Sequence, residues 1–306
     1  MRAKIWIALL LVYIIWGATY LGIKMAVETI PPFLMAGTRF LLAGAGLYIW
    51  RRLAGDPRPT TGQWLRGGLV GLLMLFGGNG LLSLAEKSVA SGIAALIIGS
   101  APLWMTTMEA LRPGGVRPNW LGIAGLVIGF GGIALLVGPS LLHATTAVSQ
   151  PVGVLILLLA AFFWSLGSIF SRSADLPRST LLSTAVEMLG GGMGLYLAGT
   201  LTGEWHQFTL AGISGRSWLG LAYLTLFGSL VGFTAYAWLL RNAPISLVST
   251  YAYVNPLVAI LLGSLLDQET LTVQIAVAAA VIIGSVVLIN LSRQIKARHR
   301  TPVTVK

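Results

Sequence analysis

The stretch Gly44-Ala45-Gly46-Leu47-Tyr48 returns 148 residues later as Gly192-Met193-Gly194-Leu195-Tyr196. The same offset places Trp16 on Trp164. Leucine matches alone would mean little in so apolar a chain, but paired Gly, Tyr and Trp matches at one offset indicate duplication. The chain therefore consists of two copies of one unit, a pattern typical of secondary transporters.

Composition places the chain in a membrane. Hydrophobic residues make up 56% of its 306 residues and charged residues 9%, whereas soluble domains carry roughly 25% charged residues. So little polar surface cannot cover a water-soluble globule. The sequence therefore predicts an integral membrane protein.

Ten apolar stretches are long enough to cross a hydrocarbon core, which takes roughly 20 helical residues. We expect them at residues 5–24, 33–50, 67–85, 90–108, 119–138, 151–171, 180–201, 218–240, 245–266 and 271–291. The predicted fold is all-α: an integral membrane protein with ten transmembrane helices in two five-helix repeats. These repeats cover 5–138 and 151–291, and a basic tail follows at 292–306.

The distribution of Lys and Arg predicts the orientation. Sixteen of the 20 basic residues fall in alternate segments between the spans, while only Lys24, Lys87 and Arg216 fall in the opposite set. Since cytoplasmic loops carry the positive excess, both termini are expected in the cytoplasm. Five spans per repeat is an odd number, so the second repeat is inverted relative to the first, as alternating access requires.

The chain lacks the residues and motifs that several other classes of function require. The chain contains no Cys, and its His residues lie apart at 143, 206 and 299, so we expect no metal site and no cofactor. No Lys follows a Gly, which excludes the ATP-binding P-loop, and no G-x-S-x-G motif occurs. We therefore expect no enzyme activity. The net charge of +11 has a topological explanation, and the tail is read as an anchor to membrane lipid with no nucleic-acid partner.

A resemblance to a known family rests on several short motifs. They are Tyr13-Ile14-Ile15-Trp16-Gly17-Ala18-Thr19-Tyr20, Gly37-Thr38-Arg39-Phe40, Ser91-Gly92-Ile93-Ala94-Ala95-Leu96 and Ser249-Thr250-Tyr251-Ala252-Tyr253-Val254-Asn255-Pro256. With them the chain resembles the drug/metabolite transporter (DMT) superfamily, specifically its ten-span EamA-type exporters and their YedA-like branch.

This resemblance implies a secondary transporter of the inner cell membrane that exports or exchanges small organic solutes. Coupling to a proton or to a counter-solute stays open, as does the choice between monomer and homodimer. A lipid or lysolipid flippase of the same architecture is the alternative function. A channel fits less well, because a single Asn-Pro does not make a pair of re-entrant half-helices.

Six polar or aromatic residues are the candidate substrate-binding residues: Trp16, Asn79, Trp164, Tyr251, Tyr253 and Asn255. Trp16 and Trp164 lie away from both membrane interfaces, where Trp is usually enriched, so each either lines a cavity or packs against neighbouring helices. Asn79 offers either a substrate contact or an interhelical hydrogen bond.

Four further residues are candidates for coupling or gating. Glu187 is the only acid deep inside a predicted span, and its repeat counterpart at the offset of 148 is Arg39. Charged groups are costly in a bilayer, so Glu187 either faces the polar cavity as a proton or cation partner or serves a structural hydrogen bond. For Arg39 the structural role is favoured, because its long side chain can reach outward from that depth. Pro102 and Pro256 match at an offset of 154 and interrupt the backbone ladder at equivalent places.

Glu86 lies at the outer end of the third predicted span, beside Lys87. We expect these two residues to form a solvated pair at the mouth of the bundle.

The orientation can be tested in this Cys-free chain with single cysteines. A membrane-impermeant maleimide added outside should label cysteines at Ser140 and Thr202, and should not label cysteines at Thr60, Ser173 or Thr301. External labelling at Thr301 would overturn the predicted orientation.

Overall fold

The structure is a computed structural model that describes residues 2–111, 117–142, 151–269 and 271–300. Within these ranges the chain forms helices joined by short loops, and no strand occurs. Eight of the described helices are long and apolar enough to cross a membrane, and two shorter apolar helices cover Trp120–Leu136 and Val254–Leu266. This architecture agrees with the predicted all-α fold of ten spans.

Helices of the first repeat follow one another along five passes. The first pass consists of α1 (Arg2–Leu11), the π-helical η1 (Val12–Trp16) and α2 (Gly17–Val27), and the second is α3 (Pro32–Leu53). The third pass consists of α4 (Thr61–Gly71), the π-helical η2 (Leu72–Gly80) and α5 (Leu81–Ala85). The fourth consists of α6 (Ser91–Ile98) and α7 (Ala101–Leu111), and the fifth is α8 (Trp120–Leu142).

The second repeat has the same order of passes. It begins with α9 (Pro151–Ser173) and α10 (Thr180–Leu201), followed by two short 3-10 turns, η3 (Glu204–His206) and η4 (Leu210–Gly212). Then come α11 (Gly215–Tyr223), η5 (Leu224–Phe233) and α12 (Thr234–Asn242); α13 (Ile245–Val248) and α14 (Tyr251–Leu266); and α15 (Val273–Arg300). Because α15 continues past residue 291, the first part of the predicted tail is helical.

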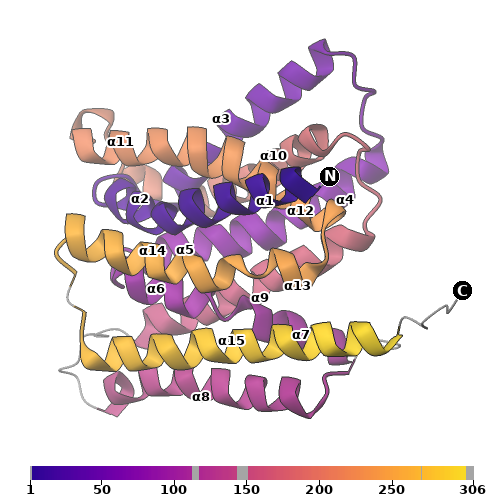
Figure 1. The fold of residues 1–306 in the computed structure, drawn as a ribbon. Coiled ribbons are helices and arrows are strands. Elements are labelled where there is room, and N and C mark those ends of the chain that lie inside the picture. The colour runs from indigo at the N-terminus through magenta and orange to yellow at the C-terminus, as the bar shows by residue number, and fades with distance from the viewer. Residues whose placement is uncertain (1, 112–116, 143–150, 270, 301–306) are drawn as a thin grey trace, which may run out of the picture.

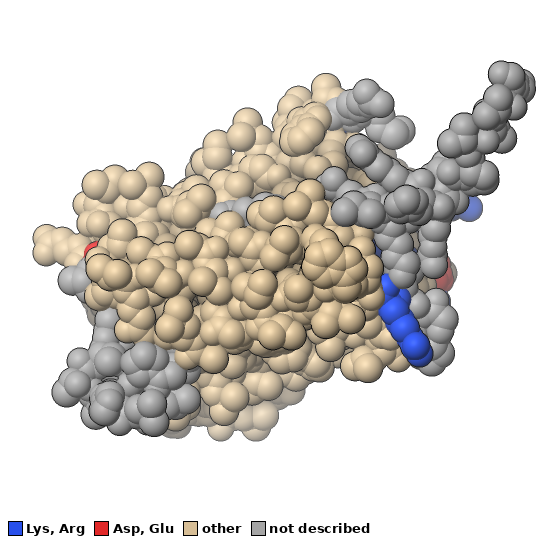
Figure 2. All heavy atoms as spheres, turned by 60° about the horizontal axis from the view of Figure 1, so that its bottom comes forward, with Lys and Arg blue, Asp and Glu red and all other residues tan. Residues whose placement is uncertain are grey.

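The outer face of the bundle is apolar. On the face shown in Figure 2 the charged side chains that are drawn lie only toward the two ends. Large side chains such as Trp120, Val127 and Val273 are 75%, 68% and 80% exposed. A water-soluble monomer does not expose apolar surface on this scale, whereas a bilayer solvates it. The exposed face is therefore the lipid-facing surface.

Helices of the two repeats pack in a reciprocal way. Three pairs of equivalent helices contact each other: α3 with α10, α6 with α14, and α8 with α15. Figure 1 shows α8 and α15 side by side. The first pass packs through α2 on α11 of the eighth, and the sixth pass, α9, packs on η2 of the third. These two contacts exchange when the repeats are exchanged, which is what a pseudo-twofold axis requires.

Glycines allow the third and seventh passes to touch backbone to backbone. A Cβ on Gly71 would lie 1.9 Å from the carbonyl oxygen of Glu187, and one on Gly191 would lie 2.6 Å from the carbonyl oxygen of Gly71. A Cβ on Gly190 would meet the Cα of Gly68 at 2.5 Å in the same way. Membrane helices without a hydrophobic drive to associate use such small residues for close packing.

The helix interruptions are only partly those expected from the prolines. In the fourth pass the break at Gly99 and Ser100 directly precedes Pro102. In the ninth pass Pro256 lies inside α14, and the break lies earlier, at Ser249 and Thr250. Three passes also contain π-helical segments, which the proline pattern did not indicate. Such segments are frequent at functional sites.

Carboxylates in equivalent loops tie the repeats together at opposite ends. Glu204 accepts hydrogen bonds from the backbone N–H groups of Phe33 (3.2 Å) and Leu34 (2.9 Å), at the start of α3. In the equivalent loop of the first repeat, hydrogen bonds from Arg51 and from Ser179 at the start of α10 lower the pKa of Asp56 to about 2. Anionic groups are favourable at helix N-termini, where N–H groups lack partners.

Replacing Glu204 by Ala should destabilise the bundle, because two buried N–H groups lose their acceptor. We expect a loss of about 1–3 kcal/mol in unfolding free energy, seen as a lower midpoint of thermal unfolding. Asp175→Ala is the matched control, since Asp175 pairs with Arg66 while its side chain is 65% exposed, and such pairs contribute little. Equal midpoints for the two variants would contradict the capping role.

Candidate functional site

An aromatic cluster lies where the repeats meet. The ring of Trp16 is 5.4 Å from that of Trp164, its repeat equivalent, in an edge-to-face contact. Tyr236 lies 4.8 Å from Trp16 and 5.4 Å from Trp164, and Tyr251 lies 5.8 Å from Trp16. Such aromatic contacts prefer these tilted geometries, so the cluster is a rigid wall built from four different passes.

Hydrogen bonds fix each indole of this cluster. Trp16 Nε1 donates to the carbonyl oxygen of Gly228 in η5 at 3.1 Å, and Trp164 Nε1 donates to the Tyr251 hydroxyl at 3.1 Å. The contacts with glycine are also reciprocal. A Cβ on Gly232 would meet Trp16 Nε1 at 2.4 Å, and a Cβ on Gly78 would meet the Trp164 ring at 3.0 Å. Each Trp is thus seated against a glycine of the other repeat.

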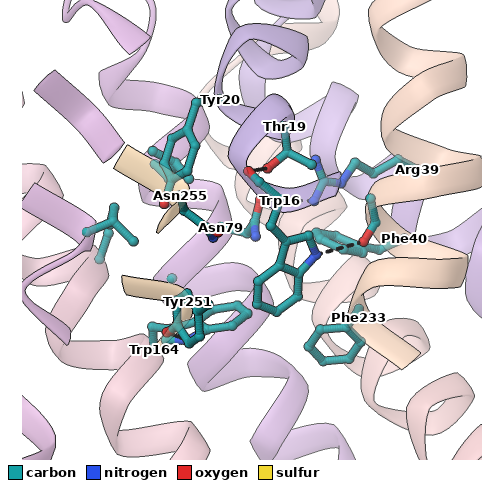
Figure 3. Close-up of a pocket in the computed structure, with 15 residues that line it drawn as sticks. Trp16, Thr19, Tyr20, Arg39, Phe40, Asn79, Trp164, Phe233, Tyr251 and Asn255 are labelled. Carbon is teal, nitrogen blue, oxygen red and sulfur yellow. Dashed lines mark hydrogen bonds between the residues drawn. The ribbon is translucent and has the colours of Figure 1, made fainter. Parts of the chain in front are cut away.

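A small cavity lies between the aromatic cluster and the polar side chains of Arg39 and Asn79. Figure 3 shows Trp16 between Arg39 and Phe40 on one side and Tyr251 and Trp164 on the other. All of them, together with Asn79, line one cavity. Its volume of about 40 Å³ is room for a few water molecules. Pockets for drug-sized ligands span roughly 300–1,000 Å³, so this conformation is closed around the cavity.

Arg39 is the least satisfied group of this wall. Its side chain is 3% exposed, its Nη2 donates to Asn79 Oδ1 at 3.1 Å, and its guanidinium lies 4.3 Å from the ring centroid of Phe40. Among the described residues, Nε and Nη1 of Arg39 have no hydrogen-bond partner. Buried donors are normally paired, so these two are available to an acceptor that enters the cavity.

Asn255 serves both the cavity and the helix packing. It is 2% exposed and lines the cavity. With the amide oriented by its hydrogen-bond network, its nitrogen donates to the carbonyl oxygens of Tyr13 (3.2 Å) and Tyr251 (3.3 Å). Asn255 therefore joins η1 of the first pass to α14 of the ninth, beside the bond between the Tyr13 hydroxyl and Thr250 Oγ1.

A second cavity lies toward the end of the bundle that carries the termini. Its volume is about 220 Å³, and its lining includes Arg172, Glu187, Phe233, Tyr236 and Arg241. Phe233 also lines the first cavity, so it separates the two spaces. We call the second cavity the vestibule.

The opposite end of the bundle is tied by ion pairs. Arg216 at the start of α11 bonds to Glu28 after α2, with a nitrogen–oxygen distance of 3.3 Å, and to Asp267 after α14. These contacts join the first, eighth and ninth passes at that end. Solvated pairs of this kind contribute little to stability, so they can open at small cost.

The candidate residues from the sequence fall in three groups. Five of the six substrate-binding candidates, Trp16, Asn79, Trp164, Tyr251 and Asn255, line the first cavity together with Arg39. Glu187 lines the vestibule, while Pro102 and Pro256 are buried and line neither cavity. The side chain of Tyr253 lies outside the described residues, as do the side chain of Ser140 and all of Thr301.

Arg39 and Glu187 do not pair with each other. Glu187 is 4% exposed and its Oε1 accepts a hydrogen bond from Ser183 at 2.8 Å, one turn earlier in α10. Arg39 is bound to Asn79 instead. Sequence reasoning missed Tyr236 and Phe233, although a Tyr deep within a span was the available signal, since Tyr in membrane proteins favours the interfaces.

Glu86 corrects one expectation from the sequence. Its position beside Lys87 predicted a solvated pair at the mouth of the bundle, but the Glu86 side chain is 0% exposed. Among the described residues, neither of its carboxylate oxygens has a hydrogen-bond partner. The turn after α5 folds inward here, so Lys87 faces solvent while Glu86 points into the bundle.

Comparison with known proteins identifies the family. A model of the EamA-like transporter family matches this chain twice, over residues 3–138 and 151–291. The chain belongs to the EamA-like transporter family. It is 38% identical over 287 residues to the uncharacterized inner membrane transporter YedA of Escherichia coli K12, covering 94% of this chain and 90% of that protein. It thus falls in the YedA-like branch of the DMT superfamily.

More distant relatives have the same span of similarity. The uncharacterized transporter YvbV of Bacillus subtilis is 24% identical, with 92% of this chain and 91% of that protein covered. A crystal structure of a protein with 22% identity superposes with a TM-score of 0.66 over 95% of this chain and 98% of that one. At this identity the superposition supports the fold alone. The family and the apolar helices make the chain a multi-pass membrane transporter.

The reciprocal Trp–Gly contacts can be tested with single methyl groups. Gly232→Ala should displace the Trp16 indole from Gly228, because its Cβ would lie 2.4 Å from Trp16 Nε1. Overpacking of this kind costs about 1–3 kcal/mol, and the tryptophan emission spectrum should shift with it. Gly131→Ala is the control, since a Cβ there meets no heavy atom within 4 Å. Indistinguishable unfolding midpoints and spectra would mean that Trp16 is not held there.

Proposed function

We propose that this chain is a secondary transporter that exports or exchanges small organic solutes by alternating access between two inverted repeats. The repeats cover 5–138 and 151–291, and both termini face the cytoplasm. The observation that carries the proposal is the position of the aromatic cavity. Trp16 and Trp164 are equivalent in the two repeats and lie 5.4 Å apart, so the cavity lies at the pseudo-twofold axis, where a site can be exposed to either side in turn.

The wall chemistry supports a solute with one apolar part and one hydrogen-bond acceptor. Trp16, Trp164 and Tyr251 offer aromatic faces for the apolar part. The two unpaired donors of Arg39 suit a carboxylate or another oxygen acceptor. A solute with several positive charges fits poorly, because Arg39 is a fixed cation in the wall. Zwitterions and neutral amphiphiles therefore fit best.

Asn79 and Asn255 would orient such a solute. Asn79 Oδ1 already accepts from Arg39 at 3.1 Å, which leaves its amide N–H groups free to face the cavity. Asn255 uses its nitrogen for the carbonyl oxygens of Tyr13 and Tyr251, which leaves its oxygen as an acceptor. Together with Tyr251, and with Tyr253 nearby in the sequence, they complete the proposed substrate-binding group.

The two cavities support a closed state with access toward the cytoplasm. The central cavity holds about 40 Å³, and the vestibule beyond Phe233 holds about 220 Å³. Arg216 closes the opposite end through Glu28 and Asp267. In the cycle we propose, Phe233 moves to join the cavities, and Glu187 in the vestibule acts in coupling or gating. The break before Pro102 and the proline-containing α14 are the proposed hinges.

A thermal-stabilisation screen of the purified protein tests this function directly. Candidate ligands are amino acids, polyamines, aromatic cations and lysolipids. A ligand at a hundred times its dissociation constant stabilises by about 2.7 kcal/mol, which is readily seen in an unfolding midpoint. Stabilisation by an amino acid, a zwitterion without an acyl chain, supports the solute transporter, whereas stabilisation by lysolipids alone would favour the flippase. No stabilisation by any class contradicts a solute site.

Tryptophan variants then locate the site for a ligand found in this way. Trp16→Ala, Trp164→Ala and Asn255→Ala should weaken its binding at least about tenfold, roughly 1.4 kcal/mol, because each removes part of the cavity wall. Trp120→Ala and Trp218→Ala are the controls, since these side chains are 75% and 46% exposed. Equal losses in both groups, at matched folding and expression, would place the binding site elsewhere.

A further inference from the structure

The carboxyl group of Glu86 has no role in the solute site described above. It is fully buried at the end of α5, and among the described residues both of its oxygens lack a hydrogen-bond partner. Burying an unpaired carboxylate costs several kcal/mol, whereas the protonated, neutral carboxyl avoids most of that cost. In this closed conformation Glu86 is therefore a carboxylic acid that holds a proton.

Two cations, one acid and one phenol surround Glu86. Lys24 and Tyr20 on α2, Arg39 on α3 and Glu269 after α14 lie within electrostatic reach of it. Lys24 donates to the carbonyl oxygen of Val89 at 3.3 Å, and Glu269 accepts from two backbone N–H groups at the start of α6. Among these described groups, only the guanidinium of Arg39 keeps two unpaired donors. Lys24, whose electrostatic effect on Glu86 is the larger, and Arg39 are therefore the two charge partners of an ionised Glu86.

The neighbours of Glu86 also connect it to the central cavity. Tyr20, Arg39 and Leu82 line that cavity, and Leu82 lies one turn before Glu86 on the same pass. The cavity has room for water, which can carry a proton toward the vestibule when Phe233 moves. Glu86 is also the first residue of the turn that joins the third and fourth passes, at the end where Arg216 closes the bundle.

The second repeat also has an acid and an arginine on the equivalent passes, with the acid and the arginine exchanged. Arg39 matches Glu187 at the repeat offset. Arg39 lies within electrostatic reach of Glu86 on the third pass, and Glu187 lies within reach of Arg241 on the eighth. The third and eighth passes are themselves equivalent. Each of the two ends therefore has an acid and an arginine from equivalent passes. Glu187 borders the vestibule, which is large enough for several waters.

We propose that Glu86 is the proton-binding site of the transport cycle, loaded from the side of the membrane opposite the termini, with Lys24 and Arg39 as its charge partners. A proton from water on that side converts the carboxylate to a neutral carboxyl, which allows the end around Arg216 to close. The proton leaves to water in the central cavity once the vestibule opens. This inference rests on the proposed alternating-access cycle, but it concerns the coupling ion and not the solute.

The inference predicts that deprotonation favours opening at the end opposite the termini. An ionised Glu86 is stable only where water, Lys24 or Arg39 reaches it, so higher pH should populate the conformation that is open there. One proton limits this shift to about tenfold per pH unit. Thr19 is a suitable reporter, because it lines the central cavity and is 8% exposed. Thr19→Cys is a small change and introduces the only thiol of the chain.

The test measures labelling of Thr19→Cys in sealed vesicles by a membrane-impermeant maleimide added on the side opposite the termini. The same cysteine is also labelled in a Glu86→Gln background. Thiol reactivity itself rises with pH in both proteins, so comparing the two removes that contribution. We expect labelling to rise with pH several-fold more when Glu86 is present than in the Glu86→Gln background. Asp175→Asn, which removes an exposed acid, should leave the rise unchanged, and Glu86→Asp should retain it.

Infrared spectroscopy provides a readout that needs no solute. The difference between spectra of the unmodified protein and Glu86→Gln should contain the band of a protonated carboxylic acid at neutral pH, where a solvated Glu with the ordinary pKa of about 4.3 is ionised. Absence of that band, or identical pH dependence of labelling in both backgrounds, would overturn the inference. The inference would also be overturned if labelling of Thr19→Cys lost its pH dependence in the Glu187→Gln background and kept it in the Glu86→Gln background. A positive result without any stabilising solute would leave the proton site standing and contradict the proposed solute function.

Discussion

Every backbone N–H and C=O group inside a bilayer must find its partner within the protein. This constraint explains both the regular and the irregular parts of the structure. The regular parts are helices, which pair their own backbone groups. In two of the three π-helical segments a side chain of the other repeat supplies a further bond. The carbonyl oxygen of Ile15 in η1 accepts from the Tyr223 hydroxyl at 3.0 Å, and that of Gly228 in η5 accepts from Trp16 at 3.1 Å.

These side-chain bonds couple the interruptions to the symmetry of the fold. Trp16 belongs to the first repeat and completes the hydrogen bonding of η5 in the second, while Tyr223 of the second repeat completes that of η1. The first and eighth passes therefore hold each other's irregular segments in place. A movement of one pass relative to the other must break or exchange these bonds, so the π-helical segments are natural places for a conformational change.

Two charged side chains inside the bundle, unlike the backbone groups, are not fully paired. Arg39 and Glu86 are almost completely buried, and both have unpaired atoms among the described residues, whereas the exposed pair of Arg66 and Asp175 is formed at 3.0 Å. Unpaired buried charges are costly, so a stable protein retains them only where a ligand, water or a proton completes them during its working cycle. Their position beside the aromatic cavity connects the solute and proton proposals physically.

Much of the architecture follows from the sequence. Ten apolar stretches, the matched Gly and Trp residues, and the bias of Lys and Arg predict ten helices in two repeats, because span length and backbone pairing leave a membrane chain few other folds. Trp16, Asn79, Trp164 and Asn255 were recognisable as polar or amphipathic residues away from the interfaces. Their periodicity, however, is compatible with either packing or a cavity, since both place a residue on an inward face.

Only the tertiary structure decided which inward residues meet. Glu86 adjoins Lys87 in sequence and reads as solvated, yet the direction of one turn after α5 buries it completely. The break of the ninth pass lies at Ser249 and Thr250, whereas Pro256 lies inside α14. Tyr236 joins the aromatic cluster through contacts with the first, sixth and ninth passes. Sequence thus determined how many helices cross the membrane, and packing between the repeats decided which side chains share a cavity, since that depends on rotations and turns that no local pattern encodes.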